Sequence, residues 1–466
     1  MDKISKENQM KKEIKALRKK FKKYDIDGYI IPKNDDYFTE YSKINRLKII
    51  SNFSGSAGLA VVLKDKNYLF TDGRYTIQSK IESGNYFKII SYEKIINCNL
   101  FKNLKLGLDP KLFTHEQIQK YFLKHNKVKF LSNNLIDEIK SQKVSNNIPF
   151  FSIKNEIVGE NRKSKINKIT NYLIKNKADN LFVTAPENVA WILNIRGGDG
   201  PNSPIPNSRL IINKSKKIFL ITEAQKVKKI IKEKIIKKDQ LVITNDLPKK
   251  ILSLGGKNFI IDNKSCSVFY ENIIKSKFKI IKKEDPTYLL KSIKNSTEIN
   301  NMIKSHIIDG VALTKFIYWI KKVNKKKITE VDAQIKLEKF RKKNSSYLYP
   351  SFETIAGSGE NGAIVHYRAK KGSCRTIRKN DIFLCDSGGQ YKYGTTDVTR
   401  TICFTNPKQN IKNIYTKVLK GHIAVANTDL KVDNTGIKID RRARKYLKES
   451  KLDYAHGTGH GVGFFL

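Results

Sequence analysis

One segment of this 466-residue chain, Asp381–Phe404, constrains the fold most, because its residues predict a β-hairpin with two aspartates at its base. Apolar Ile382–Leu384 lead into Asp386, a turn is expected at Tyr393–Thr395, and β-forming residues follow Asp397. Strands that pair about this turn bring the two carboxylates together. Two bare carboxylates at close range repel, so one of them would have to take up a proton. A divalent cation removes that conflict and suits hard oxygen ligands.

A second segment, His456–Gly463, supplies two histidines within the glycine-rich sequence HGTGHGVG. Because glycine has no side chain, the backbone can approach a ligand closely here. An imidazole can bind a metal through one ring nitrogen while a neighbouring group holds the other nitrogen. A single aspartate in a turn or a single histidine in a loop is more often structural, but the two segments together indicate a metal site.

Both segments resemble the pita-bread metallopeptidases, and most closely the Xaa-Pro aminopeptidases (aminopeptidase P). Besides DSGGQYKYGTTDVTR and HGTGHGVG, the resemblance rests on SGSAGLAVV with TDGRY (54–75), ENVAWILNIRG (187–197), GAIVHYRA (362–369) and VLKGHIAV (418–425). It follows nearly the whole chain in the order typical of three-domain members. It implies a fold of mixed α/β and α+β class: two creatinase-type N-terminal α/β domains, 1–155 and 156–285, and a pita-bread catalytic domain, 286–466.

The residues themselves also predict a duplicated α/β unit, because strand and helix patterns alternate in two successive runs. KIFLITEAQK (217–226) stands in the second run where NYLFTDGRY (67–75) stands in the first. NFIIDNKSCSVFYENII (258–274) likewise echoes KLGLDPKLFTHEQIQKYF (105–122). The letters differ but the order repeats, which indicates a structural duplication.

In the third region, Asn295 and Glu298 predict a capping box at the start of a long helix. Apolar residues follow at helical spacing, and His306 lies on that stripe, so we expect it in the core or at its boundary. A short apolar strand, Ala363–Val365, is expected just before His366.

The resemblance implies a metal site that can be carried over residue by residue. Asp386 and Asp397 match metal ligands, the second bridging two ions, and His460 matches the histidine ligand. Two divalent ions are therefore expected, with Mn²⁺ preferred and Zn²⁺ or Co²⁺ as alternatives.

The resemblance also implies roles for side chains around the metals. His366 and His456 match active-site histidines that would stabilise the tetrahedral intermediate, and His366 also contacts the bound peptide. His460 is expected to contact the substrate as well, and Arg74 in TDGRY matches an arginine that contacts peptide in some members.

The expected reaction is release of the N-terminal residue from peptides whose second residue is proline. Metal coordination lowers the pKa of a bound water, which supplies the nucleophile. Proline makes the scissile bond a tertiary amide without an N–H, so a dedicated pocket is needed. Two alternatives stay open: a prolidase that cleaves only Xaa-Pro dipeptides, and a non-catalytic pseudo-peptidase that binds protein or nucleic acid.

The composition bears on partners and compartment. The net charge of +47 suggests nucleic acid, but the lysines are spread along the whole chain and no RNA-binding motif occurs, so no nucleic-acid partner is expected. No run of 18 apolar residues is present and the N-terminus has no apolar signal core, so no membrane span is expected. The five cysteines include no CxxC pair and predict reduced thiols in a cytoplasmic protein. A homodimer is an assembly that the sequence leaves open.

Cys385 adjoins Asp386 in the sequence but is expected on the opposite face of the strand, which argues against its being a metal ligand.

The family pattern continues beyond HGTGHGVG to a further histidine and two glutamate ligands, whereas only Phe464, Phe465 and Leu466 follow here. The chain is therefore expected to be a fragment with three of the five protein ligands.

The missing glutamates give a first prediction. Because metal affinity grows with the number of deprotonated ligands, the 466-residue chain should release little or no first residue from Arg-Pro-Pro, even with excess Mn²⁺. A chain continued through its downstream reading frame should release it. Robust Mn²⁺-dependent release by the 466 residues alone, measured by chromatography, would contradict this expectation.

Overall fold

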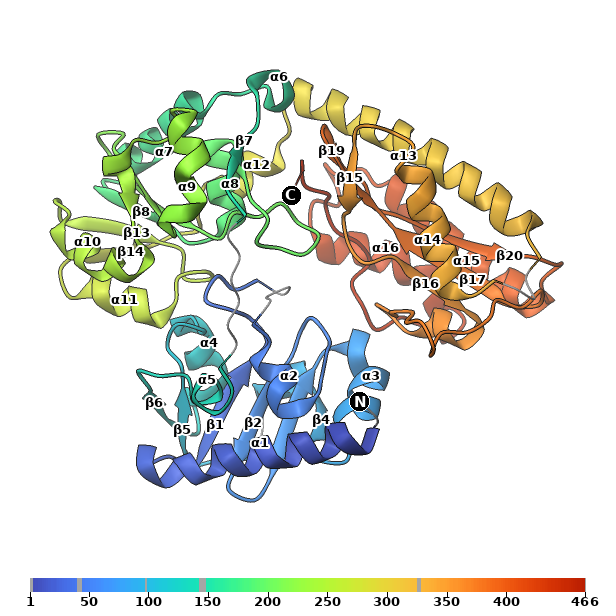
Figure 1. Cartoon of the computed structure of the whole chain (residues 1–466), viewed down its shortest axis with the longest axis horizontal. Coiled ribbons are helices and arrows are strands. Elements are labelled where there is room, and N and C mark those ends of the chain that lie inside the picture. The colour runs from blue at the N-terminus through green and yellow to red at the C-terminus, as the bar shows by residue number, and fades with distance from the viewer. Residues whose placement is uncertain (1–2, 40–43, 97–98, 142–147, 325–327, 466) are drawn as a thin grey trace.

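The computed structural model describes residues 3–39, 44–96, 99–141, 148–324 and 328–465. These residues form three bodies around a common centre (Figure 1), which we call the first, second and third domains in chain order. Each of the first two is built on its own six-stranded sheet, and the third carries two three-stranded sheets. The α/β and α+β class is therefore confirmed, whereas the boundaries 1–155, 156–285 and 286–466 stay predictions.

The first domain has the strand order β4-β3-β2-β1-β5-β6. Helix α1 (Lys3–Tyr24) covers the sheet and buries Ile14, Leu17 and Phe21 against it. The strands are β1 (Gly28–Pro32), β2 (Leu59–Leu63), β3 (Asn67–Thr71), β4 (Lys88–Ser91), β5 (Lys105–Leu108) and β6 (Lys127–Phe130), and the other α-helices are α2 (Arg46–Ser51), α3 (Thr76–Ser83), α4 (His115–Ile118) and α5 (Leu135–Ile139).

The second domain repeats this topology as β12-β11-β10-β8-β13-β14. Antiparallel pairs join β8 to β10 and β10 to β11, and the outer pairs are parallel, as at the matching positions of the first sheet. The strands are β8 (Asn180–Val183), β10 (Arg209–Asn213), β11 (Ile218–Ile221), β12 (Leu241–Val242), β13 (Asn258–Ile261) and β14 (Lys279–Lys282), with helices α7 (Arg162–Lys175), α8 (Pro186–Leu193), α9 (Ala224–Lys232), α10 (Leu247–Ser253) and α11 (Val268–Lys275). The repeated order that the sequence predicts is thus present.

The two repeats meet at equivalent positions. An antiparallel bridge joins Thr114 to Ser267, each of which directly precedes a helix that follows the fifth strand of its sheet. The amide of Val268 also donates to the carbonyl of Phe113 at 2.9 Å. Because an antiparallel bridge between matching residues is locally two-fold symmetric, a pseudo-two-fold axis relates these two connections.

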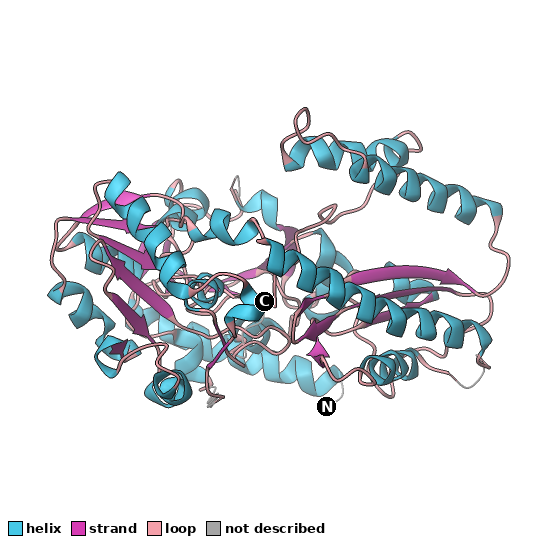
Figure 2. Cartoon of the chain, turned by 90° about the horizontal axis from the view of Figure 1, so that it is seen from above, coloured by secondary structure: helices cyan, strands magenta, loops and turns pink. Residues whose placement is uncertain are grey.

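In the third domain, helices pack on two small sheets, β15-β18-β19 and β16-β17-β20. Phe316, Leu337 and Phe383 belong to its core. The elements are α13 (Ser296–Lys322), α14 (Glu330–Arg341), β15 (Tyr347–Pro350), β16 (Ile355–Ser358), β17 (Ile382–Ser387), β18 (Gly389–Tyr391), β19 (Gly394–Thr395), β20 (Val398–Cys403), α15 (Gln409–Ala426) and α16 (Gly436–Lys448). Helices α15 and α16 pack against each other as a separate pair at the edge of the domain (Figure 2).

The predicted hairpin is present, with its tip in one sheet and its base in the other. Strands β17 and β20 pair so that Asp386 faces Thr399, while β18 and β19 close the turn beyond them. Gly388 allows the crossing between sheets, because a Cβ there would lie 1.9 Å from the carbonyl oxygen of Thr396.

Two local predictions in this domain are wrong, and one is confirmed. The capping box between Asn295 and Glu298 forms at the start of α13. However, His306 is exposed, because the inward face of α13 carries Ser305, Asp309, Leu313, Phe316 and Ile320, whereas His306 lies on the outward face with Ile303 and Ile307. Ala363–Val365 is not a strand but the end of a 3-10 turn, Gly359–Ala363, and the residues that follow it.

A buried ion pair supports the hairpin from behind. Arg341 of α14 donates to the Asp309 carboxylate of α13 at 2.6 and 3.1 Å and to Ser387 Oγ at 3.0 Å. The Tyr391 hydroxyl donates to the same carboxylate at 2.6 Å. The network thus ties two helices to the ends of β17 and β18.

Breaking this pair should destabilise the third domain strongly. We expect Asp309→Ala to cost roughly 3–5 kcal/mol, because it leaves the Arg341 guanidinium buried without its counter-charge. Asp65→Ala, at a side chain that is 73% exposed, should cost less than about 1 kcal/mol. Calorimetric unfolding checks both, and equal losses would contradict the assignment.

Candidate metal and peptide site

A cavity of about 810 Å³ opens where the three domains meet. The first domain lines it with Asp35–Tyr37, and the second with the loop Asp199–Ser203. The third domain contributes four of the six residues predicted for the site: His366, Asp386, Asp397 and His460. The sequence-distant histidines and aspartates are therefore brought to one wall of one cavity.

Burial perturbs the two carboxylates on this wall. It raises the pKa of Asp386 to about 6, and the negative charge of Asp397 adds to that rise, while Thr399 and His460 oppose it. Burial also raises the pKa of Asp397, against the attraction of His460 and His306. Asp386 Oδ1 is buried and has no hydrogen-bond partner in the described part of the chain.

His460 approaches this pair from an irregular, glycine-rich segment. Its Nε2 lies 3.5 Å from Asp397 Oδ2, and its Nδ1 lies 2.9 Å from the carbonyl oxygen of Gly461. The side chain is 74% exposed, so packing does not fix it. Within the described residues, no three acidic, histidine or cysteine side chains lie close enough together to hold an ion as they stand. Asp386, Asp397 and His460 therefore line one cavity without forming a closed set of ligands, and their assignment as metal ligands stays a prediction.

The donor set nevertheless fits a divalent cation. Two carboxylates and an imidazole are suitable ligands for Mn²⁺ or Zn²⁺, and the unpartnered Oδ1 of Asp386 is a lone acceptor that a cation would satisfy. Cys385 lies in the core on the opposite face of β17, as predicted, and offers no ligand to this wall.

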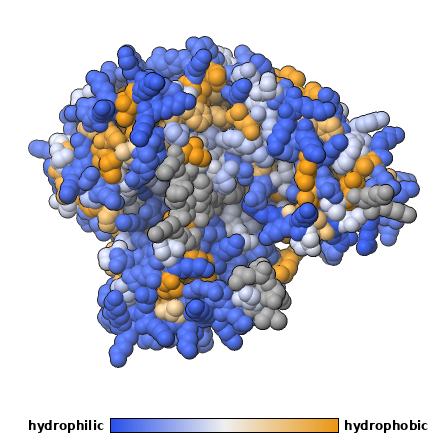
Figure 3. Space-filling model, in the orientation of Figure 1, coloured by the Kyte–Doolittle hydropathy of each residue, from blue (hydrophilic) through white to orange (hydrophobic). Residues whose placement is uncertain are grey.

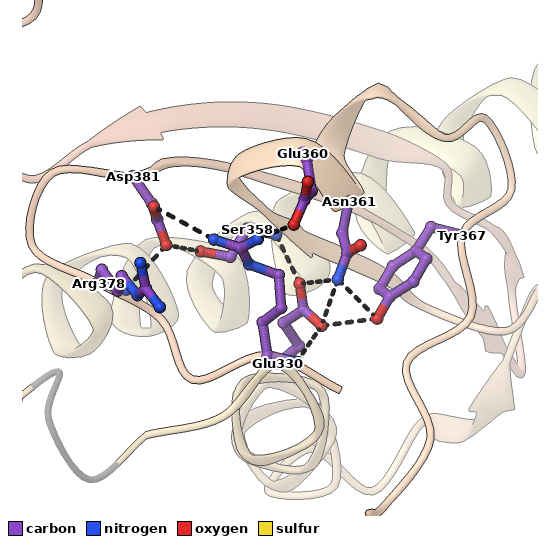
Figure 4. Close-up of polar contacts among 8 residues, drawn as sticks. Glu330, Ser358, Glu360, Asn361, Tyr367, Arg378 and Asp381 are labelled. Carbon is purple, nitrogen blue, oxygen red and sulfur yellow. Dashed lines mark hydrogen bonds and ion pairs between the residues drawn. The ribbon is translucent and has the colours of Figure 1, made fainter. Parts of the chain in front are cut away.

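A buried carboxylate organises the loop that carries His366. Glu330, at the start of α14, accepts hydrogen bonds from the amides of Ser358 and Arg375 and from the side chains of Asn361 and Tyr367. Figure 4 shows these contacts, together with Asp381 binding Ser358 and the amide of Arg378. These hydrogen bonds hold both ends of the loop that carries His366 in place.

His366 itself has a φ of 60°, a left-handed conformation that is uncommon for a residue other than glycine. Its Nδ1 lies 2.7 Å from the hydroxyl of Tyr75, a residue of the first domain. The motif TDGRY is recognisable in the sequence, but the direction of the Tyr75 side chain is not, and no sequence pattern pointed to Glu330.

The other two predicted site residues lie outside the lining of this cavity. His456 is exposed, and its Nδ1 lies 2.8 Å from the carbonyl oxygen of Gly457. Arg74 donates two side-chain hydrogen bonds, at 3.0 and 2.7 Å, to the carboxylate of Asp72. The roles carried to His456 and Arg74 stay predictions.

Hydrophilic residues cover most of the face in Figure 3, and apolar residues form scattered groups. No helix among the described residues is long and apolar enough to cross a bilayer. The four described cysteines are free thiols, and Cys98 lies outside the described residues.

Three successive parts of the chain match known protein families. Residues 300–466 match metallopeptidase family M24, and residues 13–139 and 141–298 each match the creatinase/prolidase N-terminal domain.

The whole chain is also similar to individual proteins. It is 33% identical to the "Probable Xaa-Pro aminopeptidase P" of Laccaria bicolor, over 97% of this chain and 73% of that protein. It is 34% identical to Xaa-Pro aminopeptidase 1 of Dictyostelium discoideum, over 98% and 77%. Among solved structures, the X-prolyl aminopeptidase of Caenorhabditis elegans, described as a cytosolic enzyme with a di-nuclear active site, superposes with a TM-score of 0.88 at 27% identity, covering 98% of this chain and 80% of that one.

Cation binding at this wall should depend on pH. With the pKa of Asp386 at about 6, a proton competes with the cation below that pH. Mn²⁺ affinity should therefore weaken roughly tenfold between pH 7 and pH 5. Calorimetric titration at several pH values checks this, and affinity independent of pH would contradict it.

Two variants distinguish cation binding by Asp386 from a general effect of negative charge on the surface. Asp386→Asn should weaken Mn²⁺ binding by at least roughly 10-fold and flatten its pH dependence. Asp65→Asn removes an equal charge at an exposed position and should change neither.

Proposed function

Because the chain belongs to the Xaa-Pro aminopeptidases of metallopeptidase family M24, which are hydrolases, we propose that it releases the first residue of peptides with proline in second position. One observation carries the proposal: Asp386, Asp397, His460 and His366 line a single cavity of about 810 Å³ between three domains. That volume suits a short peptide, and its walls come from all three domains.

The family and its di-nuclear relative support two divalent cations. We propose Asp386, Asp397 and His460 as their ligands within this chain, with Asp397 as the bridging carboxylate and Mn²⁺ as the metal. When bound, the cations supply Lewis-acid chemistry and lower the pKa of a water molecule. The buried, unpartnered oxygen of Asp386 supports its part in this assignment.

The chain's own residues would orient the peptide. His366, whose loop is held by the Glu330 network, would hydrogen-bond the peptide carbonyl as charge develops on the oxygen. His456 is proposed as a second such group, and Arg74 and His460 as peptide contacts. The walls from the first two domains would limit the length of the peptide and keep bulk water from the reacting bond.

The similarities favour an aminopeptidase over a prolidase, because the relatives at 32–34% identity are named Xaa-Pro aminopeptidases. The chain has Asp386, Asp397 and His460 at the positions that match the family's metal ligands, which argues against a pseudo-peptidase. A cytoplasmic location and a homodimer are further proposals, the first supported by the cytosolic relative.

Substrate length tests the reaction. The full-length protein should release arginine from Arg-Pro-Pro only when Mn²⁺ is present, and should cleave the dipeptide Arg-Pro much more slowly. Asp397→Ala should abolish release, because it removes the bridging carboxylate, while the exposed Asp65→Ala should not. Preference for the dipeptide would instead identify a prolidase.

A further inference from the structure

The hydroxyl of Tyr75 forms a hydrogen bond that crosses between domains. Its Oη lies 2.7 Å from Nδ1 of His366, and the two rings meet edge to face with centroids 5.7 Å apart. Tyr75 is 1% exposed, so this contact is shielded from water. A residue of the first domain thus holds the ring of a third-domain histidine that lines the cavity.

A third group continues this contact. The Ser56 Oγ lies 2.6 Å from the Tyr75 Oη. A phenol is a stronger acid than an alcohol, and an imidazole nitrogen is a stronger acceptor than a hydroxyl. The favoured direction therefore runs from Ser56 to Tyr75 and from Tyr75 to Nδ1 of His366.

Tyr75 is itself rigidly placed. It ends the 3-10 turn Gly73–Tyr75, its amide donates to the carbonyl of Asp72 at 3.1 Å, and its ring packs edge-on against Phe53. The same turn touches the third domain a second time, because a Cβ on Gly73 would lie 2.2 Å from the carbonyl oxygen of Ala455. The turn is therefore docked on the third domain at two points.

On this geometry, we propose that Tyr75 is a positioning residue for His366. By donating to Nδ1, it places the ring proton on Nε2 and fixes the orientation of the ring. His366 then meets the substrate as a hydrogen-bond donor, which is the form able to stabilise negative charge on a carbonyl oxygen. The catalytic part of this inference rests on the proposed function, whereas the tautomer itself does not.

The tautomer can be measured directly on the full chain. Nitrogen-15 NMR of ring-labelled histidine distinguishes the protonated ring nitrogen from the unprotonated one, and His366→Gln identifies the signals among the seven histidines. We expect wild-type His366 to carry its proton on Nε2. Tyr75→Phe should give averaged signals of both tautomers.

Tyr29→Phe is the matched control. Tyr29 is also 1% exposed, lies in the same domain, and its hydroxyl accepts a hydrogen bond from the Leu135 amide at 3.3 Å, away from His366. Tyr29→Phe should leave the His366 signals unchanged. This result would separate the general effect of losing a buried hydroxyl from the specific effect of losing the Tyr75–His366 hydrogen bond. A proton on Nδ1 in wild type, or unchanged signals in Tyr75→Phe, would overturn the proposal.

Kinetics of the full-length protein separate this inference from the proposed reaction. Tyr75→Phe should lower kcat/KM for Arg-Pro-Pro roughly 2- to 12-fold, the range expected for one hydrogen bond, mainly through kcat. If no peptide is cleaved but Tyr75→Phe changes the tautomer of His366, the proposed reaction is wrong and the positioning role of Tyr75 is supported. If cleavage is normal and Tyr75→Phe changes neither tautomer nor rate, the positioning alone is wrong.

Discussion

The buried ion pair between Arg341 and Asp309 is the contact on which the acidic wall of the third domain depends. It joins α13 and α14 and also binds Ser387 and Tyr391, at the point where the hairpin crosses from one sheet to the other. Asp386 directly precedes Ser387, so the pair fixes the backbone beside a proposed ligand. A buried ion pair is stable only when further hydrogen bonds satisfy its remaining donors and acceptors, as Ser387 and Tyr391 do here.

Burial has different consequences for two carboxylates of the third domain, Asp309 on α13 and Asp386 on β17. Asp309 has a cation and a hydroxyl within hydrogen-bond distance. Asp386 has another carboxylate nearby and an oxygen without a partner in the described chain, so its pKa rises to about 6. The same loss of solvation is therefore offset where a counter-charge is built in, and raises the pKa of the carboxylate where it is not.

The third domain does not complete the cavity alone. The duplicated domains meet at the Thr114–Ser267 bridge, and each contributes a wall opposite the aspartates. Tyr75 reaches from the first domain to His366, and the carbonyl of Asn202 in the second accepts a hydrogen bond from Gln390 in the third. The N-terminal domains therefore shape the site directly.

Local patterns in the sequence determined the hairpin, the capped start of α13, the repeated α/β order and the opposite faces of Cys385 and Asp386, because each depends on neighbouring residues and strand periodicity. Motif resemblance named four residues that line the cavity, but no local pattern predicted how closely they cluster. Tertiary structure alone decided the exposure of His306, the left-handed backbone of His366, the pinning by Glu330 and the bond from Tyr75. These depend on contacts between segments tens to hundreds of residues apart, and such contacts leave no periodic signal in the chain that forms them.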